Sequence, residues 1–216
     1  MKTPWNAGAS RRGFVRWTVL AAAACAGAVG TSAGAQADPF KIGLVLPMTG
    51  PFASTGRQID AAVKLYMAEH GSTVARRKVE VILKDDTGVP DVTKRLTQEL
   101  LINDKVDVIA GFGVTPSALA AGPIATQAKT PAIIMAAATS GIVATSPYFI
   151  RTSYTLQQSA GSMAEWTNKS GIKRVVTMVS DYGPGLDAEK VYKEAVQKGG
   201  GQVIGEIRIP MRNPDF

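Results

Sequence analysis

The residues that could do chemistry in this chain are hydroxyls, small residues and one tyrosine, each following an apolar run. Thr115 begins a predicted helix, where its hydroxyl and the free N–H groups of the first turn can receive a carboxylate. Thr139 closes the stretch 136–139, whose alanines would let a ligand approach the backbone closely. Tyr182, beside Asp181, could close over an apolar or aromatic ligand. These groups favour binding of a small carboxylate.

Each of these residues also has a purely structural interpretation. Threonine is a preferred helix N-cap, and alanine mixed with serine and threonine is common in tight loops. A tyrosine in a loop of glycine and proline often packs on the surface. The three loops together favour the functional interpretation, because open parallel sheets bind ligands at the carboxyl ends of their strands.

The composition and the motifs argue against several other kinds of site. One Cys and one His among 216 residues exclude an internal disulfide, a multi-thiolate metal site and a paired-His zinc site. The run 111–113 begins like a dinucleotide-binding fingerprint, but Pro116 occupies the position of its last glycine. The sequence also lacks a phosphate-binding loop and a nucleophile-elbow motif. We therefore expect no metal, no cofactor and no enzymatic activity.

Asp85 and Asp86 form a carboxylate pair directly after a predicted strand. Such a pair could in principle bind a metal, but adjacent residues on an extended segment point to opposite sides. No further metal ligands cluster nearby in the sequence. A polar-loop or helix-capping role is the favoured interpretation.

The formal net charge of +7 raises the question of a nucleic-acid partner. Four of the 24 basic residues lie within residues 1–37, which contain no acid, so 20 basic and 17 acidic side chains remain in the rest of the chain. A phosphate-binding surface needs a clustered excess of positive charge, and the one tight cluster is Arg76-Arg77-Lys78 at a predicted turn. We expect no nucleic-acid partner.

Residues 1–37 are predicted to be a cleavable export signal. A basic start is followed by the apolar run from Trp17 to Val29 and by small residues ending at Ala37. The apolar run is shorter than the roughly 20 residues of a spanning helix. The pair Arg11-Arg12, followed by Gly-Phe-Val, resembles the twin-arginine export motif. The alternative is an ordinary secretory signal that contains two arginines, and both interpretations predict a periplasmic protein.

From Pro39 onward, short apolar runs alternate with amphipathic stretches, which predicts an α/β fold with a doubly wound parallel sheet. Strands are expected at Phe40–Leu46, Lys78–Lys84, Val106–Ala110, Pro131–Met135, Tyr148–Thr152, Arg174–Val179 and Gln202–Ile209. Helices are expected from a cap at Ser54 or Thr55 to His70, over Pro90–Asp104, from an N-cap at Thr115, over 156–169 and over Leu186–Lys198.

These elements divide into two predicted lobes. Residues 38–155 form an N-terminal α/β lobe, and residues 156–216 begin a second α/β lobe that holds two strands. A two-stranded parallel sheet leaves open edges and an uncovered face. We therefore expect an N-terminal fragment with a truncated second lobe, which by itself would bind ligand weakly or not at all.

Five motifs in this order resemble the periplasmic substrate-binding proteins of the branched-chain amino acid ABC transporter family, a leucine-binding-protein-like group. They are Gly43 to Pro51, Lys84-Asp85-Asp86, Ile109-Ala110-Gly111, Ala136 to Thr139, and Val179 to Gly185. The resemblance runs from about Phe40 to Phe216. It implies a type I binding protein of two lobes joined by three crossovers, with the first crossover near Ser153 to Gln157.

The resemblance also implies roles for individual residues. The substrate carboxylate would be held by the Thr115 hydroxyl and by the backbone and hydroxyl of Thr139, and an amino group by the Ala137 carbonyl. Tyr182 matches a tyrosine of the pocket wall. Thr55 stands where leucine binders commonly have an aromatic residue, which loosens the assignment to leucine. Ala138 and Asp181, next to these positions, complete the candidate set.

The implied function is extracytoplasmic capture of a branched-chain or other amino acid for the membrane permease of an ABC importer. The acidic residue that grips a substrate ammonium in amino acid binders would lie beyond Phe216, so aromatic acids remain an alternative ligand class. A ligand-sensing domain of a receptor is a further alternative. A periplasmic enzyme is disfavoured, because the candidate loops offer Asp181 as their one acid rather than converging titratable groups.

Overall fold

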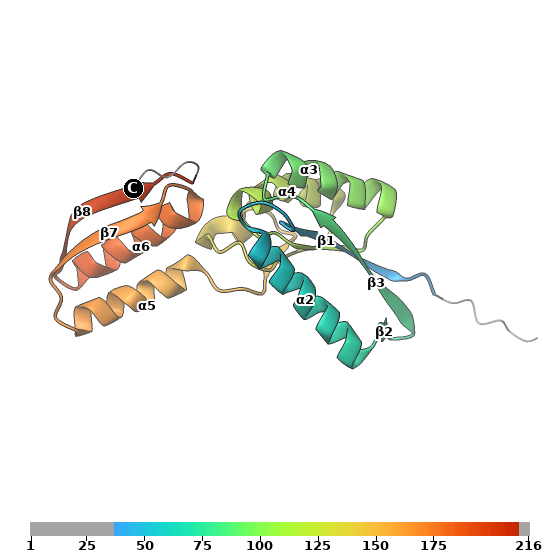
Figure 1. The fold of residues 1–216 in the computed structure, drawn as a ribbon, viewed down its shortest axis with the longest axis horizontal. Coiled ribbons are helices and arrows are strands. Elements are labelled where there is room, and N and C mark those ends of the chain that lie inside the picture. The colour runs from blue at the N-terminus through green and yellow to red at the C-terminus, as the bar shows by residue number, and fades with distance from the viewer. Residues whose placement is uncertain (1–36, 212–216) are drawn as a thin grey trace, which may run out of the picture. The chain divides into compact units, whose positions relative to one another are not determined.

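The computed structural model describes residues 37–211, and it contains two separate sheets (Figure 1). The predicted export signal, apart from Ala37, lies outside the described residues. Within this range, no helix is both long enough and apolar enough to cross a membrane.

The first sheet has six strands in the order β2-β3-β1-β4-β5-β6. The neighbours pair in parallel, except for the antiparallel pair of β2 with β3. The carboxyl ends of the parallel strands therefore meet at one edge of the sheet. The strands are β1 (Phe40–Leu46), β2 (Thr73–Val74), β3 (Arg77–Asp85), β4 (Val108–Gly111), β5 (Ala132–Ile134) and β6 (Phe149–Arg151).

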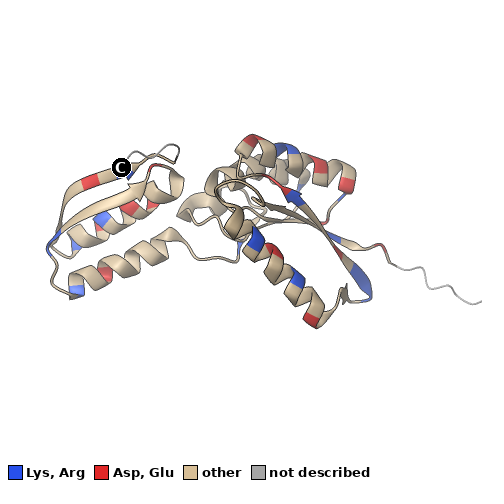
Figure 2. Cartoon of the chain, in the orientation of Figure 1, with Lys and Arg blue, Asp and Glu red and all other residues tan. Residues whose placement is uncertain are grey.

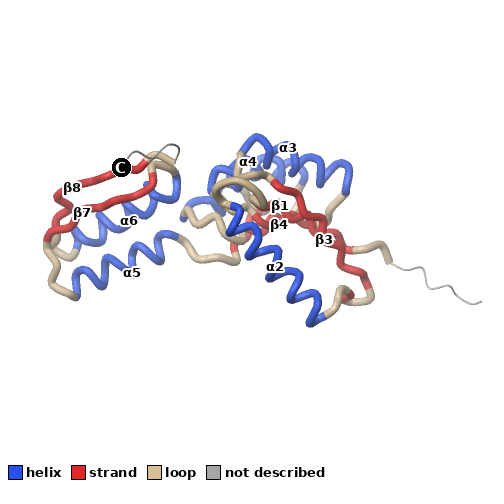
Figure 3. Tube along the Cα trace, in the orientation of Figure 1, coloured by secondary structure: helices blue, strands red, loops and turns tan. Residues whose placement is uncertain are grey.

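Helices cover both faces of this sheet, as Figure 3 shows. They are α2 (Ala53–His70), α3 (Pro90–Glu99), which continues as a π-helical turn (Leu100–Asp104), and α4 (Thr115–Ala128), followed by a 3-10 segment (Ser140–Thr145). Leu44 and Leu46 of β1 pack on the α2 side, whereas Val45 packs on the α4 side with Phe112 and Phe149. A strand that is buried on both faces needs apolar residues at successive positions. The end of β1, Leu44 to Leu46, is such a run.

The second sheet consists of β7 (Arg174–Ser180) and β8 (Gln202–Ile209), which pair in parallel. It is accompanied by α5 (Leu156–Lys169) and α6 (Gly183–Lys198). Several large apolar side chains of the two strands are at least 46% exposed, namely Val176, Met178, Ile204 and Ile207. Residues 38–155 and residues 156–216, the two predicted lobes, thus each contain one of the two sheets. The boundary between residues 155 and 156 stays a prediction.

The α/β alternation is confirmed, but three helix starts differ from the sequence prediction. Helix α2 begins at Ala53 with Phe52 as N-cap residue, so neither Ser54 nor Thr55 caps it. Helix α4 has Val114 at the N-cap, and Thr115 is its first helical residue. Helix α6 begins at Gly183 rather than Leu186, and Pro184 lies in its first turn, where the missing N–H breaks no intrahelical hydrogen bond.

The bounds of the seven predicted strands were accurate to within two residues, whereas the two-residue strand β2 was not predicted. The largest difference is in β4, which was expected from Val106 and begins at Val108. Lys105 adopts the left-handed conformation after the π-helical turn, and the Val106 N–H donates to the Leu100 carbonyl at 3.1 Å. Val106 therefore finishes the preceding helix, whereas the Asp107 N–H already donates to the Lys41 carbonyl of β1 at 2.9 Å.

Candidate ligand-binding site

Backbone hydrogen bonds connect β1, the loop after β4 and the loop after β5 at the edge where the parallel strands end. The Phe112 N–H donates to the Val45 carbonyl at 2.9 Å, and the Ala137 N–H donates to the Phe112 carbonyl at 2.9 Å. Gly111 has φ +119, and a Cβ there would lie 2.1 Å from the Val45 carbonyl oxygen. Because a side chain at Gly111 would collide with β1, glycine is required for the turn that brings Thr115 beside the β5 loop.

Thr115 and Thr139 form a pair of hydroxyls, with their Oγ1 atoms 2.8 Å apart. Thr115 is 2% exposed. A Cβ on Gly183 would lie 3.4 Å from Thr115 Cγ2 and 3.7 Å from Thr139 Oγ1, so the start of α6 covers the pair. The prediction that Thr115 caps its own helix was wrong, since its hydroxyl bonds Thr139 instead. The start of α6 thus lies beside this hydroxyl pair, in which Thr139 is partly exposed.

The backbone around Thr139 is already partly engaged. The Thr139 carbonyl accepts a hydrogen bond from Arg151 Nη2 at 2.6 Å, and the Ala138 carbonyl accepts one from the Leu156 N–H at 2.9 Å. Burial lowers the pKa of Arg151, while the charge of Asp187 opposes that shift. Ala137 is 2% exposed and bonds the β4 loop through its N–H. Among these residues, Thr139 keeps a hydroxyl directed at Thr115.

A hollow of about 460 Å³ lies between the first-sheet loops and the loop before α6. Its lining is Phe52, Gly88, Pro90, Val114, Pro116, Asp181, Tyr182, Pro210 and Met211. Two predicted site residues, Tyr182 and Asp181, therefore lie in this hollow, next to Val114 and Pro116, which flank Thr115. Burial is the main cause that raises the pKa of Tyr182. The walls are mostly apolar, as in many small-molecule sites.

Phe52 is the residue that the sequence analysis missed. It provides an aromatic wall from the loop after β1, whereas Thr55 lies in the first turn of α2 and is not part of the lining. A Cβ on Gly88 would lie 3.0 Å from the Phe52 ring, so the glycine lets the ring sit against the loop after β3. The signal was present in the sequence, because Phe52 follows Pro51 in the loop where an aromatic was sought.

Ser140 and Asp187 connect the loop after β5 with helix α6. Asp187 Oδ2 accepts hydrogen bonds from the Ser140 backbone N–H at 2.9 Å and from the Ser140 hydroxyl at 2.8 Å. The Ser140 hydroxyl oxygen also accepts a bond from the Gln157 N–H at 3.2 Å. One serine therefore bonds both helices that accompany the second sheet, directly beside Thr139.

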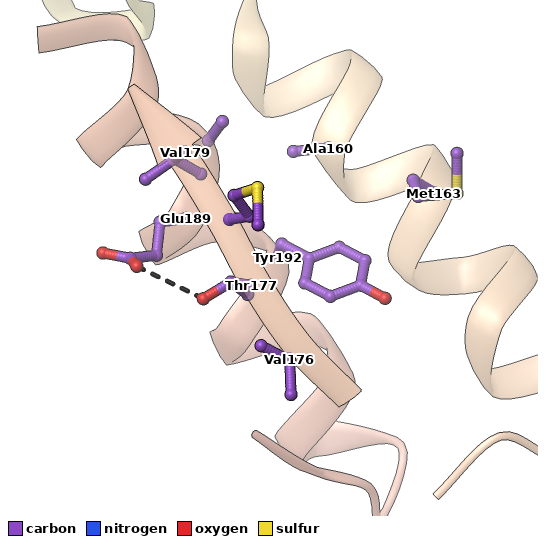
Figure 4. Close-up of a pocket in the computed structure, with 9 residues that line it drawn as sticks. Ala160, Met163, Val176, Thr177, Val179, Glu189 and Tyr192 are labelled. Carbon is purple, nitrogen blue, oxygen red and sulfur yellow. Dashed lines mark hydrogen bonds between the residues drawn. The ribbon is translucent and has the colours of Figure 1, made fainter. Parts of the chain in front are cut away.

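A second hollow, of about 260 Å³, lies among α5, β7 and α6 (Figure 4). Its polar groups already have partners within the fold. Glu189 bonds Thr177 at 3.2 Å and pairs with Arg208 at 2.7 Å, and the Tyr192 hydroxyl lies 2.8 Å from the Thr167 hydroxyl. The Arg208 hydrogen bond is the main cause that lowers the pKa of Glu189. This hollow offers few free polar groups to a ligand.

Charged residues of both signs are interspersed over the helices and strand ends, as Figure 2 shows. A nucleic-acid surface needs clustered positive charge, so this distribution gives no support to a nucleic-acid partner. In the described part of the chain, no group of three or more His, Cys, Asp or Glu residues is placed to hold a metal ion.

The chain thus has an α/β fold with a largely apolar hollow beside the ends of its parallel strands. The chain belongs to a family described as "Periplasmic binding protein", which matches residues 39–216. The resemblance to this class is thus confirmed, as is the type I fold. Membership of this family implies a periplasmic location. Members of the family are solute-binding proteins rather than enzymes.

Individual relatives agree with this assignment. The chain is 44% identical over 183 residues to "Leu/Ile/Val-binding protein homolog 6" of Brucella abortus (strain 2308), which covers 84% of this chain and 47% of the relative. It is also similar to a solute-binding protein of an ABC transporter from Rhodopseudomonas palustris BisB5, solved with 3,4-dihydroxybenzoic acid. That match has 60% identity and a TM-score of 0.81, and covers 82% of this chain and 49% of the other.

A leucine-binding protein from Thermotoga maritima MSB8 is more distant. It has 26% identity and a TM-score of 0.70, and the match covers 81% of this chain and 49% of that one. A solute-binding protein from R. palustris, solved with 4-hydroxybenzoate, has 38% identity and a TM-score of 0.79 over 83% of this chain and 49% of the other. The chain spans about half the length of the relatives that it matches.

Proposed function

We propose that the protein is the solute-binding component of an ABC importer, which captures a small carboxylate and delivers it to a membrane permease. The observation that carries this proposal is the hydroxyl pair of Thr115, buried at the start of α4, and Thr139, in the loop after β5, beside a largely apolar hollow. A helix start and two hydroxyls suit a carboxylate. Binding without chemistry is proposed, because the lining supplies Asp181 as its one acidic side chain.

Two ligand classes compete for this site. Branched-chain and other amino acids are supported by the names of the curated relatives. Aromatic acids are supported by the Phe52 and Tyr182 walls, and by structures of relatives solved with dihydroxybenzoic acid and hydroxybenzoate. The aromatic class is favoured, because two aromatic residues line the hollow and the 60% identical relative holds an aromatic acid.

The test is titration calorimetry of the full-length protein with 3,4-dihydroxybenzoate, 4-hydroxybenzoate and leucine. We expect the two aromatic acids to bind and Thr115→Ala to weaken that binding by about 1 to 3 kcal/mol, the usual loss when one partner of a charged hydrogen bond is removed. Thr130→Ala, near the opposite end of α4, is the matched control and should leave affinity unchanged. Unchanged affinity in Thr115→Ala would contradict the assigned role, and binding of leucine alone would contradict the aromatic preference.

We also propose that residues 1–37 direct export and are removed after Ala37. The basic start, the apolar run and the small residues support this proposal. Mass spectrometry of the protein from the periplasm should give an N-terminus at Asp38. Replacing both Arg11 and Arg12 by Lys should block export if the twin-arginine route is used, and leave it intact if the signal is an ordinary secretory one.

A further inference from the structure

We propose that Asp85 and Asp86 are positioning residues that hold two walls of the ligand site in place, an inference that rests on the proposed function. Asp85 is the last residue of β3 and Asp86 follows it, and neither residue lines the hollow. Hydrogen bonds nevertheless join the Asp85 carboxylate to the loop that carries Phe52. They join the Asp86 carboxylate to Thr93 of α3, whose hydroxyl contacts the helix that carries Thr115.

Asp85 bonds both loops around Phe52. Its Oδ1 accepts hydrogen bonds from the backbone N–H groups of Met48 at 2.8 Å, Thr49 at 3.3 Å and Thr87 at 2.8 Å. Its Oδ2 accepts one from the Thr49 hydroxyl at 2.7 Å. The first loop then turns and places Phe52 in the hollow, while the second continues to Gly88, which lies against the Phe52 ring. Asp85 therefore fixes the loops on both sides of this ring.

Asp86 connects the loop after β3 with helix α4 by way of Thr93. It is 0% exposed, and its Oδ1 accepts a hydrogen bond from the Gly88 N–H at 3.0 Å. Its Oδ2 accepts one from the Thr93 hydroxyl at 2.7 Å, and the hydroxyls of Thr93 and Ser117 lie 2.7 Å apart. Ser117 is in the first turn of α4, two residues after Thr115. This chain of bonds fixes the start of α4 relative to β3.

The division of roles follows from the sequence. Adjacent residues at the end of a strand point to opposite sides, so an Asp-Asp pair can serve two different neighbours. The donors described above are all neutral backbone or hydroxyl groups, which satisfy the carboxylates and fix geometry without an ion pair. A preformed wall lowers the ordering cost of ligand binding, so loss of either carboxylate should reduce affinity although neither touches the ligand.

A double-mutant cycle on the full-length protein tests the role of Asp85, with 3,4-dihydroxybenzoate as the probe. We expect Asp85→Ala to weaken binding by about tenfold or more, as for loss of a preorganised wall. Asp85→Asn should bind within about threefold of wild type, because the Asn carbonyl oxygen can still accept the same backbone hydrogen bonds. Glu69→Ala, which removes an exposed carboxylate of α2, is the control.

The cycle separates positioning from general destabilisation. If Asp85 acts through Phe52, the double variant Asp85→Ala/Phe52→Ala should bind as weakly as Phe52→Ala alone. Additive losses, or unchanged affinity in Asp85→Ala, would overturn the role of Asp85. For Asp86, Thr93→Val should weaken binding while Asp85 is intact, and unchanged affinity would overturn the connection to α4.

The proposed function and this inference can fail separately. If wild-type protein binds none of the tested acids, the proposed function fails, and hydrogen exchange then decides the positioning role. The amides of Met48 and Thr87 should exchange faster in Asp85→Ala than in wild type or Asp85→Asn. Equal exchange in all three proteins would overturn the inference without reference to any ligand.

Discussion

The contact between Ser140 and Asp187 should control how firmly α6 is held against the first sheet. Asp187→Ala removes two hydrogen bonds to one carboxylate oxygen, donated by the Ser140 N–H and hydroxyl at 2.9 and 2.8 Å. A hydrogen bond to a charged group contributes about 1.5 to 3 kcal/mol when well shielded. Because Asp187 is half-buried, we discount this and expect a loss of about 1 to 3 kcal/mol for the pair.

A loss of this size changes the equilibrium constant between the arrangement with α6 held against the first sheet and one with α6 released by about 5- to 150-fold. The assay is double electron–electron resonance between spin labels at Glu69→Cys in α2 and Lys190→Cys in α6, both exposed positions. The one cysteine of the chain, Cys25, lies within residues 1–37, so protein that begins at Asp38 carries only the two introduced cysteines. We expect a narrow distance distribution in the otherwise wild-type protein and a broad one in Asp187→Ala.

Two variants make the reasoning refutable. Ser140→Ala keeps the backbone N–H bond and loses the hydroxyl bond, so its distribution should be intermediate in width. Glu194→Ala removes an exposed carboxylate from the same helix and should behave as wild type. A distribution in Asp187→Ala as narrow as that of wild type would show that the two hydrogen bonds do not hold α6.

Two further predictions concern stability. Because the Arg208 hydrogen bond depresses the pKa of Glu189, its stabilisation is fully present above the ordinary value of 4.5 and is lost as pH falls through the lower, folded-state value. Acid unfolding below pH 4.5 should therefore be less steep in Glu189→Gln, as followed by circular dichroism. Gly111→Ala should cost about 3 kcal/mol or more in thermal unfolding, since its Cβ would meet β1. Gly141→Ala, where a Cβ meets nothing within 4 Å, should be neutral, and equal melting temperatures would contradict the argument.

The apolar runs predicted the elements well, whereas contacts between distant residues decided the details. Strand β1 was placed correctly, because burial on both faces requires successive apolar residues. The start of α2 was missed, since it is set by a turn at Gly50, which has φ +77. The partner of Thr115 lies 24 residues away, and hydrophobic periodicity carries no information on such a pair.

The candidate site was predictable only in part. Tyr182, predicted from its place after a strand, lines the hollow, and its role in binding stays a prediction. Phe52 also lines the hollow, but the sequence prediction named Thr55 in that loop instead. The capping box of α5, in which Thr155 and Gln158 bond each other's backbone, has a Thr-x-x-Gln signature that could have been recognised. The hydrogen bond from Ser140 to Asp187 joins residues 47 positions apart in the sequence, so no local sequence pattern predicts it.

The hydrogen bond between the Leu156 N–H and the Ala138 carbonyl attaches the first residue of helix α5 to the loop beside Thr139. The helix has 14 residues, so at 1.5 Å per residue it extends about 21 Å from that anchor. A tilt of about 10° at the anchored end would displace the far end by about 4 Å. Because Thr167 and Asn168 near that far end bond Tyr192 and the Ala195 carbonyl of α6, α6 would move together with α5, and a spectroscopic label at Lys169 could record the displacement.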